Sequence, residues 1–501
     1  MKNNRSLSRL SALLVVAFGL LQSECCWASD VEVDGICYDL NHEAKTACVV
    51  ADYLHEYSGS VILPSQVAFE GVPYTVNAIG DYAFYSSGIE TISIPTSVTM
   101  IGEHAFSTCR ELQEIIFSEG LISIGDCAFM YCQSLLSLSL PNSLTSIGKE
   151  AFRECSNLEM VSFGDAVTII GNNAFSFCNA LTSVHIPENV TEVSDYLFSG
   201  CRKLSSVCFH DGVTSIGKGA FYACESLESV TLPNSVTSIG NQAFCACSAL
   251  QSVTLSGNLE VISQYAFESC LNLSHVDIPE GVKNIGPASF RYCSALTSVT
   301  LSESVDTIST FAFAQCVNLS AITLPEKLSV IGYHAFESCT SLTSFDVPDG
   351  LSFLGIGAFI GCSSLERVSM PGVPLLMTDV FVGAAVLAEI KVNACEPITV
   401  EDESRFVDDE VYANSVVYVP VGFVDAYRNA IGWRRFAHIE EDATLNGTNI
   451  RGVTEDSQAS SPYYNLLGQR VHQLRKGAVY VRNAKKCIFD IYIPFACLKS
   501  K

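Results

Sequence analysis

The chain has 501 residues and carries 53 acidic against 28 basic side chains, for a formal net charge of −25. Such a charge repels nucleic acid and anionic membranes, so neither is expected as a partner. The chain is longer than one compact core allows, unless it grows along a single axis as repeat solenoids do.

Residues 1–28 have the features of a secretory signal peptide. Basic residues begin the segment, the apolar run 10–21 follows, and the small residue Ala28 ends it. The residues before Cys25 and Cys26 do not fit a lipid-attachment signal. No later segment has the run of about 18 apolar residues that a membrane span needs. We therefore expect an exported chain, at the cell surface or extracellular, without a transmembrane span.

Residues 29–76 predict a β-rich N-terminal cap. Two apolar segments flank the polar residues 41–45, as in a hairpin, and a second hairpin is expected around Gly71. Cys37 and Cys48 would face each other across the first hairpin if Asp39 paired with Thr46. They are therefore a candidate disulfide in an exported chain.

The central part of the chain repeats every 23 residues, which indicates stacked supersecondary units. The period is marked by a phenylalanine and, three residues later, by a cysteine. The in-register phenylalanines are Phe106, Phe129, Phe152, Phe175, Phe198, Phe221, Phe244, Phe267, Phe290, Phe313, Phe336 and Phe359. The even spacing predicts one column of phenylalanines and one of buried, reduced cysteines that act as small apolar side chains.

Each repeat contains two extended segments and a turn. Val230 and Leu232 alternate with polar residues, which predicts a strand with one buried face, and Pro233 ends it. A shorter strand precedes Gly240, and the following N-Q-A-F-C-A-C favours a single helical turn. Because the place of Gly240 holds Ser194 in another repeat, crowding rather than positive φ is expected to explain the glycine.

The combination of L-x-x-V-x-L and I-G-x-x-A-F-x-x-C over residues 77–393 resembles the BspA-like, treponemal-type leucine-rich repeats of bacterial surface proteins. The resemblance implies an α/β repeat solenoid, mostly β with short helical turns. We expect about 14 coils of 23 residues, a parallel sheet on one face and a cap at each end. It also implies a surface protein that binds other proteins.

The exposed strand positions carry mainly serine and threonine, which fit a stacked sheet and need no functional explanation. The same positions are also the ones that would touch a ligand, and a few residues interrupt the hydroxyl pattern. The candidate partner-binding residues are His185, Cys208, Thr231, Thr254, His275, Asp277, Thr300, Asp346 and Arg367.

The repeat ends near residue 393, and residues 394–442 predict a C-terminal cap. Its helix would carry Ala426, Tyr427, Ala430, Trp433 and Phe436 at helical spacing. The acidic residues before it lack the ligand spacing of a calcium loop, so they predict a solvated loop.

Two further segments close the chain. Residues 443–462 are polar and predict a linker. Residues 463–501 are similar to the C-terminal β-type sorting module of type IX secretion, which implies surface anchoring. The match departs after position 486, where residues 487–501 extend beyond the usual end of such modules.

No nucleophile, metal-ligand or phosphate-loop motif is present, so we expect no enzyme, no catalytic residues, no metal and no cofactor. The resemblance implies a non-catalytic adhesion protein that binds host matrix or other bacterial surface proteins, and we expect it to be a monomer. The alternative is a glycan-binding surface module, although aromatic side chains are missing from the exposed strand positions. An extracellular protein is therefore the expected partner, ahead of a glycan.

Overall fold

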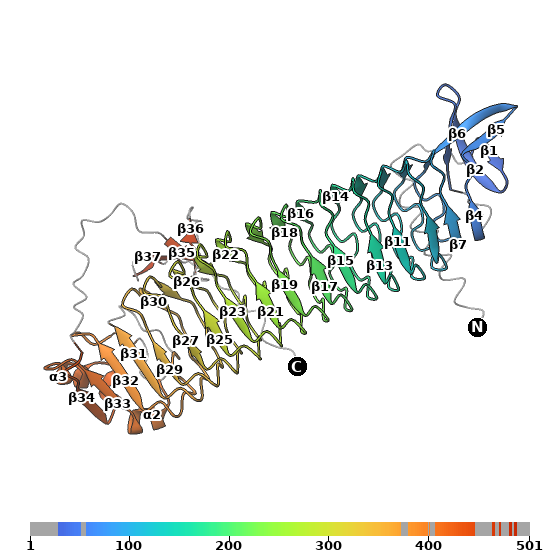
Figure 1. The fold of residues 1–501 in the computed structure, drawn as a ribbon. Coiled ribbons are helices and arrows are strands. Elements are labelled where there is room, and N and C mark those ends of the chain that lie inside the picture. The colour runs from blue at the N-terminus through green and yellow to red at the C-terminus, as the bar shows by residue number, and fades with distance from the viewer. Residues whose placement is uncertain are drawn as a thin grey trace, which may run out of the picture.

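The computed structural model describes residues 29–51, 57–371, 379–398, 400 and 406–445, together with four short strands between 463 and 487. Figure 1 shows an elongated solenoid that runs from a β-rich N-terminal cap to a C-terminal cap holding the helices. The expected signal peptide, most of the expected linker and residues 488–501 lie outside the described residues.

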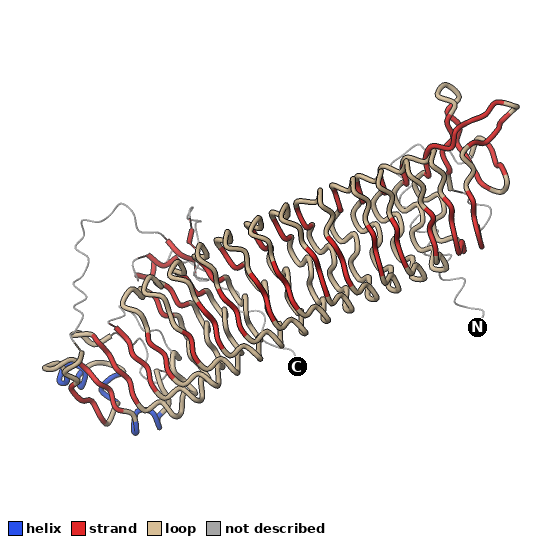
Figure 2. The backbone as a smooth tube through the Cα atoms, in the orientation of Figure 1, coloured by secondary structure: helices blue, strands red, loops and turns tan. Residues whose placement is uncertain are grey.

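Fourteen longer strands, one per coil, form one face of the solenoid, called here the long-strand face (Figure 2). They are β7 (Gly88–Ser93), β9 (Glu114–Ile116), β11 (Ser137–Ser139), β13 (Met160–Ser162), β15 (Ser183–His185), β17 (Ser206–Cys208), β19 (Ser229–Thr231), β21 (Ser252–Thr254), β23 (His275–Asp277), β25 (Ser298–Thr300), β27 (Ala321–Ile322), β29 (Ser344–Asp346), β31 (Arg367–Pro371) and β32 (Glu389–Asn393). Paired strands are parallel and in register, as where Val230 lies opposite Val253. The predicted 23-residue coil is therefore confirmed.

Shorter strands form a second parallel ladder at the top of Figure 1. They are β8 (Met100–Ile101), β10 (Ser123–Ile124), β12 (Ser146–Ile147), β14 (Ile169–Ile170), β16 (Glu192–Val193), β18 (Ser215–Ile216), β20 (Ser238–Ile239), β22 (Val261–Ile262), β24 (Asn284–Ile285), β26 (Thr307–Ile308), β28 (Val330–Ile331) and β30 (Phe353–Leu354).

The third side of each coil is a series of tight turns, and the prediction of a helical turn there is wrong. Gln242 and Ala246 have φ of 62° and 61°, and two positions in each turn recur with positive φ along the array. The backbone N–H groups of Gln242, Phe244 and Ala246 donate to carbonyls of the next coil at 2.7–3.0 Å. In a helix these N–H groups would bond within the same turn, along the helix axis. Here the N–H of every second residue of the turn bonds to the neighbouring coil instead.

The core is a continuous stack of fourteen phenylalanine rings from Phe84 to Phe381. Successive ring centroids are 4.8 to 5.8 Å apart and the rings are within 19° of parallel. Tyr57 packs on the first ring and Phe406 on the last. These two residues close the stack, so neither terminal phenylalanine ring is left uncovered.

The cysteine column runs beside the phenylalanine stack. Its members are Cys109, Cys132, Cys155, Cys178, Cys201, Cys224, Cys247, Cys270, Cys293, Cys316, Cys339 and Cys362. All are buried free thiols, as predicted. Each also donates its S–H to the phenylalanine carbonyl of the preceding coil, as Cys224 does to Phe198 O at 3.3 Å. The position therefore needs a small apolar side chain that is also a donor.

Close packing between coils favours glycine at the corners. A Cβ on Gly217 or Gly240 would lie 2.6 or 2.5 Å from backbone atoms of the preceding coil, and neither residue has a positive φ. Ser194 and Ser263 occupy the same corner, and the short-strand ladder breaks there, between β14 and β16 and between β20 and β22. At both places the serine hydroxyl donates to a carbonyl of the preceding coil, Ser194 to Ile170 O and Ser263 to Ile239 O. In the other coils this carbonyl accepts the backbone N–H of the corner residue.

Ser309 shows that serine itself does not break the ladder. Its hydroxyl donates to Asn284 Oδ1 at 3.0 Å, which leaves Ile285 O free to accept the Ser309 N–H at 2.9 Å. The short strands β24 and β26 therefore stay paired. A corner serine thus leaves the ladder continuous where the preceding coil supplies another acceptor for its hydroxyl, and interrupts it where the hydroxyl takes the ladder carbonyl.

In the middle of the array the long-strand face is divided into pairs of coils, whereas toward the ends it forms sheets of three and five strands. Strands β11 and β13, β15 and β17, and β19 and β21 are hydrogen-bonded within each pair but not to the next pair. A proline follows the first strand of each pair. The residue just before this proline donates its backbone N–H to the second strand, as Leu232 does to Thr254 O at 2.9 Å. The 46-residue spacing of these prolines therefore matches a structural unit.

The N-terminal cap contains both expected hairpins. Strands β1 (Val31–Val33), β2 (Ile36–Asn41) and β3 (Thr46–Val49) are antiparallel, and β5 (Gln66–Phe69) pairs with β6 (Val72–Ile79) across Gly71. Strand β3 joins the short-strand ladder through β6, while β4 (Ser58–Ile62) pairs with β7 at the end of the long-strand face.

The C-terminal cap extends the long-strand face by two strands and contains short helices. Strands β33 (Val416–Val419) and β34 (His438–Glu441) continue the sheet in parallel. Two short helices, α2 (Asp409–Asn414) and α3 (Val424–Asn429), and the 3-10 turn η2 (Trp433–Arg435) pack beside them. The expected single helix is interrupted at Gly432, whose φ is 83°, although Tyr427, Trp433 and Phe436 are buried as predicted.

Near the C-terminus the backbone forms a small antiparallel sheet. Its strands are β35 (Tyr463–Asn465), β36 (Arg470–Val471), β37 (Tyr480–Arg482) and β38 (Lys485–Cys487), in the order β36-β35-β37-β38. They fall within residues 463–501, where the sequence predicts a β-type module.

Candidate functional site

The nine candidate partner-binding residues are all exposed on the long-strand face. The strand register places His185 opposite Cys208, Thr231 opposite Thr254 and Asp277 opposite Thr300. Within each long strand, the middle side chain points into the core and the side chains before and after it are exposed. The exposed side chains therefore form two columns along the array. The two columns therefore offer a long series of polar groups rather than a cavity.

His275 and Asp277 form a small polar cluster on this face with residues of β25. His275 Nε2 lies 2.9 Å from Asp277 Oδ1, and its Nδ1 lies 2.8 Å from Ser298 Oγ. Hydrogen bonds from Thr300 and His275 lower the pKa of the Asp277 carboxyl.

This cluster has the residue types of a hydrolytic triad but not its surroundings. The side chains of His275 and Asp277 are 45% and 75% exposed. An activated serine needs hydrogen-bond donors preorganised in a water-excluded site, and this flat sheet surface does not exclude water. The cluster is therefore suited to hydrogen bonding with a ligand rather than to catalysis.

Large apolar side chains are exposed at the N-terminal end of the long-strand face. These are Ile62, Ile116, Leu136 and Met160, which are between 50% and 79% exposed. The sequence alone does not single them out, because an exposed apolar residue is common on protein surfaces. Their restriction to the first coils becomes visible only once the strands are in register. The face therefore changes from partly apolar at the N-terminal end to hydroxyl-rich in the middle.

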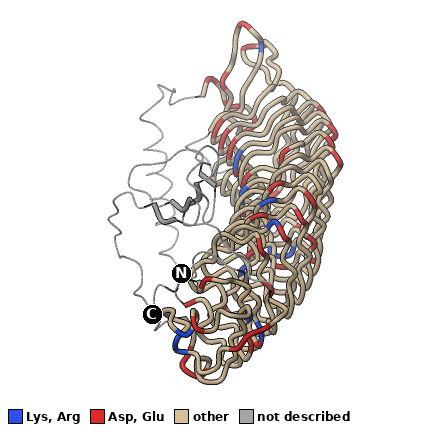
Figure 3. Tube along the Cα trace, turned by 90° about the vertical axis from the view of Figure 1, so that its left-hand side faces the viewer, with Lys and Arg blue, Asp and Glu red and all other residues tan. Residues whose placement is uncertain are grey.

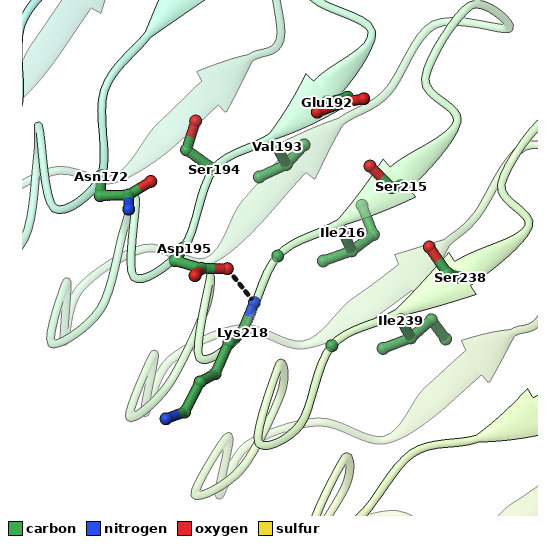
Figure 4. Close-up of a pocket in the computed structure, with 12 residues that line it drawn as sticks. Asn172, Glu192, Val193, Ser194, Asp195, Ser215, Ile216, Lys218, Ser238 and Ile239 are labelled. Atoms are coloured by element: carbon green, nitrogen blue, oxygen red, sulfur yellow. Dashed lines mark hydrogen bonds between the residues drawn. The ribbon is translucent and has the colours of Figure 1, made fainter.

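A shallow trough of about 450 Å³ lies on the short-strand side of the array (Figure 4). It spans β16, β18 and β20 beside the ladder break at Ser194, and Glu192, Ser215 and Ser238 line it. Asp195 Oδ1 accepts the backbone N–H of Lys218 at 2.7 Å, so one carboxylate oxygen serves the coil-to-coil contact. The exposed lining residues Glu192 and Ser238 are polar, whereas Val193, Ile216 and Ile239 at the floor of the trough are buried apolar side chains.

Cys37 and Cys48 do not form the candidate disulfide. Asp39 pairs with Cys48 rather than with Thr46, so Cys37 lies two residues from the register that a disulfide needs. Both thiols are free. Burial, followed by the nearby Asp39 and Asp81 carboxylates, raises the pKa of Cys48 to about 11.

Among the described residues, Lys, Arg, Asp and Glu are distributed along the length of the array (Figure 3). No helix of the described ranges is long and apolar enough to cross a bilayer. Among the described residues, no group of three or more His, Cys, Asp or Glu side chains is arranged to hold a metal ion.

The repeat array is similar to repeats of known proteins. The family model of the BspA type leucine rich repeat region (6 copies) matches residues 77–205, 168–297 and 283–400. A crystal structure of a leucine-rich repeat protein from Bacteroides ovatus is 30% identical, with a TM-score of 0.63, and the match covers 72% of this chain and 94% of that one.

Two further solved structures have similar sequences. A leucine rich cell surface protein from Faecalibacterium prausnitzii is 30% identical over 72% of this chain and 94% of its own, with a TM-score of 0.46. A leucine-rich repeat protein from T. pallidum is 31% identical over 44% of this chain and 91% of its own, with a TM-score of 0.35. No curated protein matches the chain.

Proposed function

Because the chain belongs to the BspA-type leucine-rich repeat family, we propose that it is a non-catalytic, exported surface protein that binds another protein through its long-strand face. The observation that supports this most is the pair of exposed columns, which extend in register along the array. Such a surface supplies contact area rather than a reaction pocket.

Many weak polar contacts along this face can combine into useful affinity. Exposed serine and threonine hydroxyls both donate and accept hydrogen bonds, and each one contributes little by itself. Display of many copies on a cell links the binding events and raises the effective concentration of the partner. The partner class that fits is an extracellular protein with an extended polar surface, such as host matrix or another bacterial surface protein.

A pair of charge substitutions tests the face. Thr231→Lys with Thr254→Lys places two cations side by side on β19 and β21, where the wild-type side chains are exposed. The matched control is Ser238→Lys with Val261→Lys, at exposed positions of the short strands of the same coils.

Binding is measured against immobilised matrix proteins with cells that display either variant. We expect the first pair to weaken adhesion and the control to leave it unchanged, because only the first pair alters the long-strand face. Loss of adhesion in the control with retention in the first pair would refute the proposal and move the contact to the other side.

A glycan-binding role receives less support. Sugar rings stack on exposed aromatic faces, and the exposed columns of the long-strand face contain no aromatic side chain. Aromatic residues do lie on the turns, and two of their rings already contact a neighbouring residue. Arg291 lies 4.6 Å from the centroid of the Tyr292 ring, and Gly200 packs against the Phe177 ring. A glycan array beside the matrix-protein assay separates the two functions.

We further propose that the N-terminal residues direct export and that residues 463–501 provide sorting or anchoring at the cell surface. The support is the signal-like composition of residues 1–28 and the resemblance of the last segment to a type IX module. Deletion of residues 457–501 should release the protein from the surface or retain it in the cell. Unchanged surface display of the truncated chain would contradict the sorting role.

A further inference from the structure

Four strands of the two caps, β1, β4, β5 and β34, have a single strand partner among the described residues, and these edge strands differ in charge. Strand β1 carries Glu32 between Asp30 and Asp34, and β34 ends in Glu440 and Glu441. Charged side chains on an edge strand are a common protection against pairing with another chain. In a chain of net charge −25 these two edges also repel a second copy.

Strand β4 lacks this protection. Its sequence, S-G-S-V-I, and the adjoining Tyr57, Leu63 and Pro64 contain no charged residue, and the nearest charge along the chain, Glu56, lies outside the described residues. Among the described residues β7 is its only strand partner, so its outer edge faces away from the array. Figure 1 shows β4 as the outermost strand of the long-strand face at the N-terminal end.

The backbone of β4 offers hydrogen-bonding groups on that outer edge. Leu63 donates its N–H to Ser93 O at 3.1 Å, toward the array. Because backbone groups alternate in direction along a strand, those of Ile62 and Ser60 point outward. The Ile62 side chain is 79% exposed, more than any other large apolar side chain of the described residues. An uncharged edge with an exposed isoleucine is a template for strand addition.

We propose that two copies of this chain associate head to head through β4. An antiparallel pairing about Ser60 is two-fold symmetric, because each β4 then presents the same groups to the other, and such self-complementary contacts close as dimers. The acidic edges β1 and β34 oppose any longer assembly. This proposal does not depend on the proposed binding function, and it replaces the sequence-based expectation of a monomer.

The dimer joins two long-strand faces into one continuous sheet. It brings two sets of exposed columns to one particle, so a partner with repeated sites would be held by both copies. Salt should strengthen the dimer, since it screens the repulsion between two chains that each carry a charge of −25.

Sedimentation equilibrium of the mature full chain, at low and high salt, tests the proposal. We expect a monomer–dimer equilibrium without larger species. Ile62→Lys should weaken the dimer at least about tenfold, because lysine on an edge strand disfavours pairing. The matched variant Ile169→Lys changes an isoleucine that is 61% exposed within the array, and it should leave the equilibrium unchanged.

A second variant tests the pairing register. Ser60→Cys should form a disulfide-linked dimer on a non-reducing gel, because the pairing places residue 60 opposite its own copy. The control Thr231→Cys places an exposed cysteine in the middle of the array, and it should not form a disulfide-linked dimer. A wild-type chain that stays monomeric at every concentration and salt level would overturn the proposal. So would a dimer that survives Ile62→Lys or an assembly that grows beyond two copies.

Discussion

Raising the pH should destabilise the solenoid through its cysteine column. Desolvation by burial raises the pKa of Cys109 to about 11 from a model-peptide value of 9.0, and it raises those of the other column thiols as well. The unfolded chain therefore loses these protons at a lower pH than the folded chain does. The stabilising contribution is fully present below pH 9.0 and is lost as the pH rises from there toward the pKa of the folded state.

The size of the effect follows from the number of thiols that open together. Each thiol that is ionised only in the unfolded state costs about 1.4 kcal/mol of stability per pH unit. A cooperative unit of three coils therefore loses about 4 kcal/mol per pH unit. Urea denaturation followed by circular dichroism at a series of pH values measures this slope directly.

Two variants isolate the contribution of the column. Cys224→Ala with Cys247→Ala removes two buried thiols, so the unfolding free energy of those coils should fall less steeply with pH. Cys208→Ser changes an exposed thiol and should leave the slope unchanged. An unfolding free energy that stays constant above pH 9.0 would refute the reasoning. So would a thiolate absorbance of the folded protein that decreases in Cys224→Ala with Cys247→Ala, because it would come from the buried column.

The ladder break at Ser194 should close in Ser194→Gly, because removal of the hydroxyl frees Ile170 O to accept the backbone N–H of residue 194. Hydrogen-exchange mass spectrometry should show slower exchange there, whereas Ser309→Gly should show no change, since the Ser309 N–H is already bonded. Phe221→Ala should lower the unfolding free energy by about 3–5 kcal/mol, since it leaves a cavity in the middle of the ring stack, and a loss below 1 kcal/mol would contradict the tight packing. Cys37 and Cys48 should both be recovered as alkylated thiols after non-reducing denaturation, and a mass increment for a disulfide would contradict the register.

The repeating parts of the fold were predictable because each coil places the same residue types in the same surroundings. The period alone was enough to place Phe221 and Cys224 in buried columns. The conformation of the turn was not predictable, because N-Q-A-F-C-A-C is short enough to form a helical turn, and hydrogen bonds to the next coil decide against it. The S–H donor role of Cys224 depends on the same contact between coils.

The N-terminal hairpin shows how one side chain sets a register. Asn41 Oδ1 accepts the N–H groups of Glu43 and Ala44 at 3.1 and 2.9 Å, which fixes a four-residue loop between Asn41 and Thr46. The sequence contains this asparagine but gives no sign of which loop length it selects. A shift of two residues was sufficient to separate the two cysteines.

The candidate site shows the same limit. Exposure of the nine candidate partner-binding residues follows from strand alternation, so it could be predicted. The position of Ile62 at an open edge could not, because it depends on which strand ends the sheet.

The pairing of coils on the long-strand face has a genetic consequence. Recombination between similar repeats adds or removes whole segments of a gene. A change of 46 residues preserves the alternation of proline-ended and proline-free strands, and therefore each hydrogen-bonded pair. A change of 23 residues places two strands of the same kind next to each other and disturbs a junction, as at Pro325 and Pro348, where the pairs give way to the three-stranded sheet β23-β25-β27. Natural alleles that differ in length should therefore differ mostly by even numbers of coils.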